Sequence, residues 1–219
     1  MDKQTQLNDV IQGLRSAISE LREVLIASTD GLAIAHSHGA SDPNRVAAMA
    51  AVHRLDWRSL RLEKLLLPEH GSHPLEQIVN YYAAALDWAT DGTPRPELAA
   101  AVDWLRTHCY EVEDPVLCWG DARLSNVLYG PDQRMAAVLD WEMATLGPRE
   151  QDVAWLIFAH MVFQELTGLA GLPGMPEFMR EDDVRAVYRE HTGVELGGLH
   201  WFYVYSGVIW ACVFMRTSA

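Results

Sequence analysis

The residues best suited to chemistry in this chain are Asp121, Asn126 and Asp140, in the segment VLCWGDARLSNVLYGPDQRMAAVLDWE. Transfer of a phosphoryl group requires a carboxylate that orients the attacking hydroxyl and accepts its proton, together with oxygen ligands for Mg²⁺ on the phosphates. An Asp-x-x-x-x-Asn loop followed by an aspartate at the end of a strand supplies both. The pattern therefore predicts a phosphoryl-transfer centre.

Short apolar runs of strand type must position these side chains, and they cover residues 116–119, 126–129 and 135–139. A Gly-Pro-Asp sequence between the second and third runs provides turn chemistry. Asp121 and Asn126 are therefore expected to share one loop, and Asp140 is expected just past a strand.

A simpler alternative is that these are ordinary loop residues, because Asp and Asn are common in turns and at helix caps for reasons unrelated to catalysis. Any one of them alone would favour that interpretation. The ordered set, with the strand-loop-strand-turn-strand spacing and the continuation TLGPREQDVAWL, favours a functional motif.

The segment resembles the aminoglycoside phosphotransferase family, whose kinase-like members carry a His-Gly-Asp-x-x-x-x-Asn loop and an Asp-x-Glu or Asp-x-Asp stretch. The matching residues are Gly120, Asp121, Asn126, Asp140 and Glu142. One departure is that Trp119 stands where the family pattern usually has histidine, a position that mainly supports the loop.

The resemblance implies a role for each residue of the motif. Asp121 would be the catalytic base, Asn126 and Asp140 would bind Mg²⁺, and Asp152 in the following helix would brace the catalytic loop. The residues that would bind ATP and Mg²⁺ are the two metal ligands together with Arg123, Ser125 and Glu142. Of these, Arg123 and Ser125 could contact phosphate or substrate. The acceptor would be a small-molecule hydroxyl, which the sequence does not identify.

Helical periodicity dominates the rest of the chain and predicts an α+β, mostly helical fold that resembles the large C-terminal lobe of a protein kinase. The expected helices lie at 50–57, 76–89, 97–109, 181–193 and 200–215. We expect this phosphotransferase lobe to occupy residues 49–219 and to be truncated at the C-terminus relative to the family.

The small lobe of a kinase-like enzyme is not recognisable. Such a lobe covers the phosphates with a glycine-containing loop and pairs them with a strand lysine. The chain has two lysines, Lys3 and Lys64, neither in a strand pattern, and no Gly-x-Gly sequence precedes residue 48. Because phosphate positioning is most of the catalysis, we expect weak activity or none.

Residues 1–48 instead predict a helix, a hairpin turning at Asp30-Gly31, and a helix that begins at Pro43 after a cap at Ser41 or Asp42. This order resembles the first half of a Roadblock-type domain, a dimerising module of GTPase systems. Half of such a sheet would leave an open strand edge, so self-association or a GTPase-system partner is expected through residues 1–48. The alternatives are a local cap on the large lobe and, for function, a non-catalytic Roadblock-like regulatory protein.

Composition adds exclusions. The formal net charge of −13 over 219 residues, without a Lys/Arg cluster, argues against binding to nucleic acid. Three widely spaced cysteines fit a reducing compartment, and the polar opening MDKQTQLNDV is not a signal peptide. The apolar run 201–215 is too short to span a membrane. We therefore expect a cytoplasmic protein without a membrane segment.

Overall fold

The computed structural model describes residues 43–130, 135–171 and 174–217. Helices dominate it, as predicted, and four short strands form two small sheets. The helices are α2 (Pro43–His53), α3 (Pro74–Ala89), α4 (Pro96–Thr107), α5 (Glu150–Leu169), α6 (Glu181–Thr192) and α7 (His200–Thr217), with 3₁₀ turns η1 (Glu63–Leu65), η2 (Pro68–His70) and η3 (Leu124–Asn126).

Local sequence explains where several helices begin and end. Pro74 and Pro96 occupy the first turns of α3 and α4, where a missing backbone N–H costs nothing. Helix α6 opens with three acidic residues, carries Arg189 and His191 in its last turn, and stops at Gly193 in the left-handed conformation.

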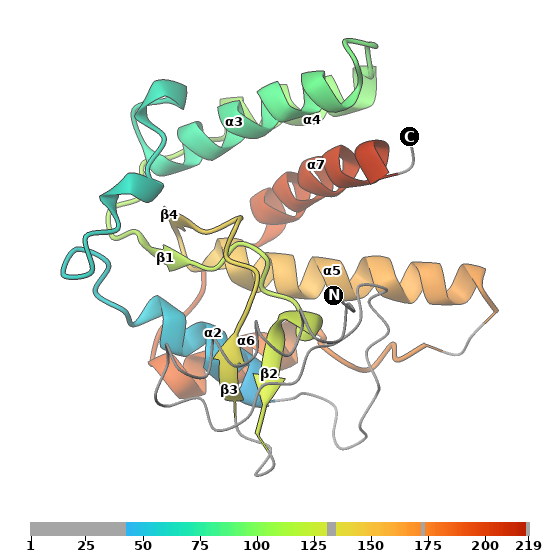
Figure 1. Cartoon of the computed structure of the whole chain (residues 1–219). Helices are drawn as coiled ribbons and strands as arrows, with labels where there is room; N and C mark the ends of the chain where they lie inside the picture. Colours follow the sequence, from blue (N-terminus) through green and yellow to red (C-terminus); the bar gives the residue numbers. More distant parts are fainter. Residues whose placement is uncertain (1–42, 131–134, 172–173, 218–219) are drawn as a thin grey trace, which may run out of the picture.

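Helix α7 is the centre of the upper part of the molecule. It packs against α3, α4 and α5, and it lies between the α3–α4 pair and α5 (Figure 1). Its buried face includes Phe202, Tyr205 and Ile209, and the indole of Trp201 on the same helix donates a hydrogen bond to the carbonyl of Leu105 at 3.2 Å. A helix that is apolar on most sides is expected in such a buried position.

The strands form two antiparallel pairs. β1 (Val116–Cys118) pairs with β4 (Thr145–Gly147), and β2 (Val127–Tyr129) pairs with β3 (Met135–Val138). The first three agree with the predicted apolar runs to within a residue at each end. β4 was not predicted, because Thr-Leu-Gly offers neither an apolar run nor an alternating pattern.

The lower part of the molecule is built on α2, which packs against α6, β1 and β3 (Figure 1). The helix runs across the predicted domain boundary at residue 48, and Val46 and Met49 on either side of it are both buried in the main core. The predicted helix and hairpin before residue 43, and with them the Roadblock resemblance, lie outside the described residues. The two-part domain division and a partner for residues 1–48 remain predictions.

None of the described helices combines the length and the apolar character needed to cross a bilayer.

Candidate active site

Asp121 lies three residues after the end of β1, near the start of the loop formed by residues 120–126, which we call the Asp121 loop. Its side chain is almost fully buried and accepts three hydrogen bonds. Arg123 Nε and Asn126 Nδ2 donate to Oδ2 at 2.8 and 2.6 Å, and Trp155 Nε1 donates to Oδ1 at 3.0 Å. The carboxylate is therefore held in one orientation by neighbouring elements.

Asn126 closes the loop. Besides the bond to the Asp121 carboxylate, its Nδ2 donates to the Asp121 carbonyl at 3.1 Å. Because the amide nitrogen is directed at Asp121, the side-chain oxygen faces away and receives a weaker 3.3 Å bond from the hydroxyl of Ser125. The Asn126 carbonyl accepts from Leu139 N at 2.8 Å, which ties the loop to the end of β3.

Asp140 and Glu142 complete an acidic cluster with Asp121. A carboxylate oxygen from each of the three lies within 4.8 Å of one from the others. Asp140 and Glu142 are exposed, and Asp140 has a positive φ of 57°, a left-handed conformation that aspartate adopts more readily than most residues. Hard oxygen donors at this spacing, with the Asn126 amide beside them, fit Mg²⁺.

Gly120 permits the close approach of the loops that carry these acids. Its φ is +88°, and a Cβ at this position would lie 2.0 Å from the carbonyl oxygen of Met143. Only glycine satisfies both the backbone conformation and the contact.

Asp152, at the start of α5, binds the backbone of the two residues that precede Asp121. Its Oδ1 accepts from Gly120 N at 2.8 Å and its Oδ2 from Trp119 N at 2.6 Å. The side chain is completely buried. These are the contacts expected of a residue that braces the loop.

Trp119 occupies the position where the family pattern has histidine. Its side chain is buried, and Nε1 donates to the Leu139 carbonyl at 2.7 Å. The indole thus connects the Asp121 loop to the residue before Asp140. The ring of Trp141, half exposed between the two acids, lies 6.3 Å from the Trp119 ring.

The remaining predicted residues lie at the rim. Arg123 has a side chain that is 33% exposed and paired with Asp121, so its guanidinium can reach both the carboxylate and the solvent side of the site. Ser125 is exposed on η3. All six predicted site residues therefore belong to two adjoining segments, 121–126 and 140–142.

Three residues near the site were not predicted from the sequence: Trp155, His53 and Tyr82. Trp155 lies three positions after Asp152, so the shared helical face of the two residues was an available signal. His53 contacts Asp152 from a position 99 residues away, which no local pattern reveals.

Tyr82 on α3 packs edge-on against Tyr205 of α7, with ring centroids 5.7 Å apart. Burial raises the pKa of its hydroxyl, with further contributions in the same direction from Tyr81, Cys212, Asp121 and Glu142.

A second cluster contains His53, Cys118 and Asp152, all buried, with possible ligand atoms within 4.8 Å of one another. Both oxygens of Asp152 already accept hydrogen bonds, and burial raises the pKa of the Cys118 thiol well above its ordinary value. The thiol, which lies near the Pro148 carbonyl, is therefore protonated. These contacts describe a structural hydrogen-bond network.

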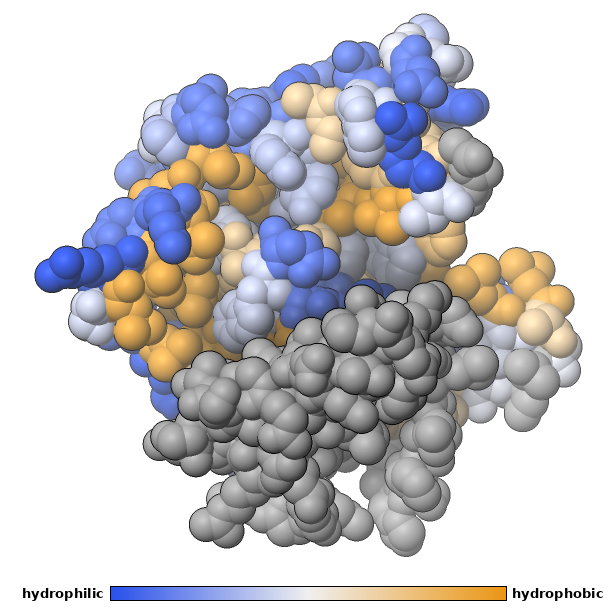
Figure 2. Space-filling model, in the orientation of Figure 1, coloured by the Kyte–Doolittle hydropathy of each residue, from blue (hydrophilic) through white to orange (hydrophobic). Residues whose placement is uncertain are grey.

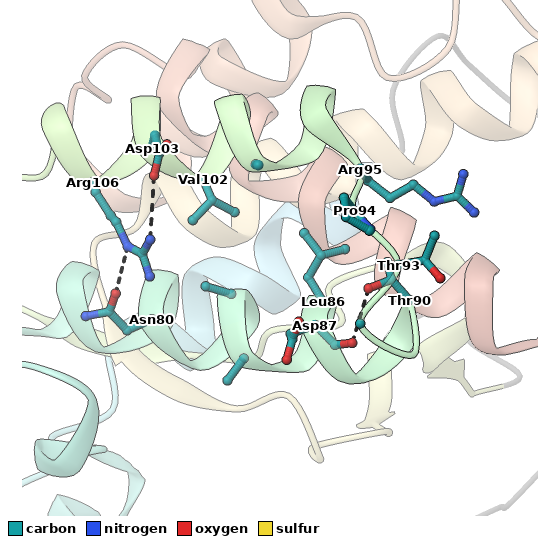
Figure 3. A pocket seen from close by; sticks show the side chains of 14 residues that line it. Asn80, Leu86, Asp87, Thr90, Thr93, Pro94, Arg95, Val102, Asp103 and Arg106 are labelled. Atoms are coloured by element: carbon teal, nitrogen blue, oxygen red, sulfur yellow. Dashed lines mark hydrogen bonds and ion pairs between the residues drawn. The ribbon is translucent and has the colours of Figure 1, made fainter.

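A groove of about 550 Å³ lies between α3 and α4 (Figure 3). Its charged lining includes Arg106, which is already bound to Asp103 and Asn80. None of the predicted site residues lines this groove. It is separate from the acidic cluster.

The acidic cluster, its loop and its brace can now be compared with known proteins. Residues 33–180 match the phosphotransferase enzyme family, whose members generally use ATP and Mg²⁺. The match begins before residue 49, where the phosphotransferase lobe was predicted to start, and it includes every predicted site residue.

Two curated relatives share parts of the sequence. The probable acyl-CoA dehydrogenase IBR3 of Arabidopsis thaliana is 31% identical in an alignment 154 positions long, which covers 61% of this chain and 18% of that protein. Acyl-CoA dehydrogenase family member 10 of Mus musculus is 31% identical in an alignment 104 positions long, which covers 42% of this chain and 10% of that protein. The chain thus spans less than a fifth of the length of either relative.

Solved structures show the same fold. A putative aminoglycoside phosphotransferase from Ralstonia eutropha JMP134 superposes with a TM-score of 0.60 and 24% identity, over 79% of this chain and 53% of that one. A macrolide 2'-phosphotransferase of type I gives a TM-score of 0.52 and 16% identity, over 81% and 54%. Since the family match covers most of the chain and the fold agrees, this chain belongs to the phosphotransferase enzyme family.

Proposed function

We propose that the chain transfers the terminal phosphoryl group of ATP to a hydroxyl of a small molecule. The observation that carries this proposal is the grouping of the Asp121, Asp140 and Glu142 carboxylates within 4.8 Å, beside the Asn126 amide. One buried carboxylate and two exposed ones provide, respectively, a fixed proton acceptor and metal ligands that face solvent.

Asp121 would orient the acceptor hydroxyl and take its proton through a carboxylate oxygen. The Asn126 side-chain oxygen and the Asp140 carboxylate would hold Mg²⁺, with Glu142 next to them. When bound, the metal supplies neutralisation of charge on the phosphates. Arg123 would contact a phosphate oxygen while remaining close to Asp121.

We propose further that turnover by this chain is far slower than that of a two-lobed enzyme. The described residues contain one lysine, Lys64, which is exposed in η1 and not on a strand. Stabilisation of the transferred phosphoryl group by a strand lysine and a covering loop is a large part of the rate in this chemistry.

The acceptor can be sought by assaying a panel of small molecules that carry a hydroxyl. This panel should include hydroxyacyl compounds beside aminoglycosides, choline-like amines and sugars. Both curated relatives carry the name acyl-CoA dehydrogenase, which supports testing acyl substrates that bear a hydroxyl. The known members of the fold named above support testing antibiotics.

The proposal is tested by thermal unfolding of the purified chain in a titration with ATP and Mg²⁺. Ligand at about 100 times its dissociation constant adds about 2.7 kcal/mol to the stability, so the unfolding temperature should rise. Asp140→Ala should abolish the metal-dependent part of the rise. Glu165→Ala, which removes an exposed carboxylate from the C-terminal part of α5, should leave the rise unchanged.

The acceptor step is tested separately by ADP release in the presence of the panel, with Asp121→Asn as the control. ADP release that is the same in the wild type and Asp121→Asn would overturn the role of Asp121. A flat thermal titration in a cooperatively unfolding protein would overturn the proposal that the chain binds ATP and Mg²⁺.

A further inference from the structure

A buried hydrogen-bond chain runs from helix α6 through α2 to the backbone of the Asp121 loop. The hydroxyl of Tyr188 lies 2.8 Å from Nδ1 of His53, and Nε2 of His53 lies 3.0 Å from Oδ2 of Asp152. Asp152 in turn accepts the amides of Trp119 and Gly120. His53, Tyr188 and Asp152 are each at most 5% exposed.

The donors and acceptors of this chain fix where the protons lie. An ionised carboxylate can only accept, so Nε2 of His53 must carry a proton and donate it to Asp152. In the tautomer that carries its proton on Nε2, Nδ1 accepts from the Tyr188 hydroxyl, so this one tautomer satisfies both bonds. Oδ2 of Asp152 is thereby shared between the histidine on one side and the Trp119 amide on the other.

Packing holds the histidine ring in the orientation that these bonds require. The Tyr188 ring meets it edge-on, with centroids 5.7 Å apart and an angle of 61° between the planes. Next to it, Arg54 binds the His191 carbonyl at 3.2 Å, so the end of α2 is attached to α6 at a second point. A residue fixed in this way can hold the Asp152 carboxylate in one rotamer.

We infer that His53 is a positioning residue for the Asp121 loop, acting through Asp152 on the Trp119 and Gly120 amides. The inference rests on the proposed function only in that the positioned loop carries the proton acceptor. His53 itself touches none of the six predicted site residues through a hydrogen bond among the described contacts. Its effect on chemistry would be indirect, through the direction of the Asp121 carboxylate.

A matched pair of amide substitutions separates the two ring nitrogens. The side-chain nitrogen of glutamine can occupy the place of Nε2 and donate to Asp152. The side-chain nitrogen of asparagine corresponds to Nδ1, so Asp152 loses the donor at position 53 and keeps only the two backbone amides. In amide hydrogen exchange, we expect His53→Asn to raise the exchange rates of Trp119 and Gly120 about tenfold or more, while His53→Gln keeps most of the protection. Core amides such as that of Ile209, buried in the middle of α7, serve as the reference for global stability.

A structural role without positioning predicts a different result. The two variants would then lose protection equally, and the factor at Ile209 would be the same as at Trp119 and Gly120. That result would overturn the inference. The ¹⁵N chemical shifts of the His53 ring in labelled wild type provide a second test. A shift showing that Nε2 carries no proton would also overturn the inference. Tyr188→Phe should shift the Nδ1 signal and leave Nε2 protonated.

Kinetics distinguish this inference from the proposed function. If the chain turns over, His53→Asn should lower kcat by about 10- to 100-fold with little change in the KM for ATP, and His53→Gln should restore most of it. If wild type shows no phosphoryl transfer, the proposed function fails, and the exchange and nitrogen shifts still decide the role of His53.

Discussion

Both carboxylate oxygens of Asp121 accept hydrogen bonds from protein side chains, and the three donors differ in how easily they can leave. Trp155 and Asn126 are buried, whereas the side chain of Arg123 is 33% exposed. An acceptor hydroxyl that approaches Oδ2 would therefore compete with Arg123 first. The same arginine released from Asp121 is available to phosphate, so proton acceptance and phosphate binding can be linked through one side chain.

Gly120→Ala should be severely destabilising. The added Cβ would meet the Met143 carbonyl at 2.0 Å, a contact with backbone that cannot be relieved by a side-chain rotation. We expect the free energy of unfolding to fall by more than about 3 kcal/mol, measured by urea denaturation, and the metal-dependent thermal response to disappear.

Gly193→Ala is the matched control for backbone conformation. Gly193 has a comparable φ of +72°, but a Cβ there would meet nothing within 4 Å. Gly193→Ala should lower the free energy of unfolding by about 1 kcal/mol, which is the ordinary cost of placing alanine in the left-handed conformation. Equal losses in the two variants would show that the contact with Met143 does not matter.

Stability should decline at alkaline pH because of buried thiol and phenol groups. Burial raises the pKa of Cys212 from 9.0 to about 11, and burial also raises the pKa of Tyr82 and Tyr205. Between pH 9 and 11 the unfolded chain loses the Cys212 proton while the folded chain keeps it, so the free energy of unfolding falls as the pH rises. Unfolding temperatures measured at pH 8 and pH 10 should show this fall.

Cys212→Ala provides the control, because it removes one contributor and should flatten the decline between pH 8 and pH 10. An unchanged pH dependence in this variant would mean that Cys212 titrates normally in the folded protein. Alkylation tests the burial of the other two thiols. Cys109 is less buried than Cys118, so Cys109 should react before Cys118.

At the scale of elements, the most consequential link is between the end of β1 and the end of β3. Trp119→Phe removes the indole N–H and leaves the Leu139 carbonyl without that donor. We expect a loss of about 2 to 4 kcal/mol in the free energy of unfolding from the unsatisfied carbonyl and the smaller ring.

Trp141→Phe makes the same chemical change in a ring that is 41% exposed and donates to the Val138 carbonyl at 3.0 Å. Water can replace that bond, so the loss should be about 1 kcal/mol or less. A Trp119→Phe variant as stable as Trp141→Phe would contradict the role assigned to the buried indole.

The strands and helices next to the site could be predicted because their signals are local. Apolar runs gave β1, β2 and β3 to within a residue at each end, and the motif placed Asp121, Asn126 and Asp140 on adjoining segments. β4 escaped because three residues carry no periodicity, and its pairing with β1 depends on tertiary contact. The order of elements was readable, whereas their partners were not.

The contacts that fix the site have the same character. Trp155 reaches Asp121 over 34 residues of sequence, and His53 reaches Tyr188 over 135. A single sequence does not show which distant residues will contact each other, because Trp155, His53 and Tyr188 taken singly are ordinary residues of buried helix faces. The acidic residues and two side chains that orient Asp121, Arg123 and Asn126, could be predicted, whereas Trp155 and His53 could not.

For the whole molecule, the acidic balance decides which surfaces it will bind. With a formal net charge of −13 and a sequence isoelectric point near 5.0, the chain should bind an anion exchanger at pH 7 and pass through a heparin column in about 0.15 M salt. Retention on heparin at that ionic strength would reveal a basic surface that the composition does not indicate.

The molecule also presents apolar side chains along one margin. Phe163, Leu166 and Leu169 on α5 are exposed, as are Val213 and Phe214 on α7. Figure 2 shows hydrophobic surface over the ends of α5 and α7 on this side. Scattered exposed apolar residues are normal in folded proteins, but a row on neighbouring helices adds to the tendency to associate.

The bond between His53 and Tyr188 has a consequence for synthesis of the chain. The two partners are 135 residues apart, so at a translation rate of about 5–20 residues per second the histidine waits between about 7 and 27 s for its tyrosine. Until α6 has left the ribosome, the Asp121 loop has its brace but not the full support of that brace. A contact between residues so far apart in sequence means that the nascent polypeptide acquires a fully supported loop only after α6 has been made.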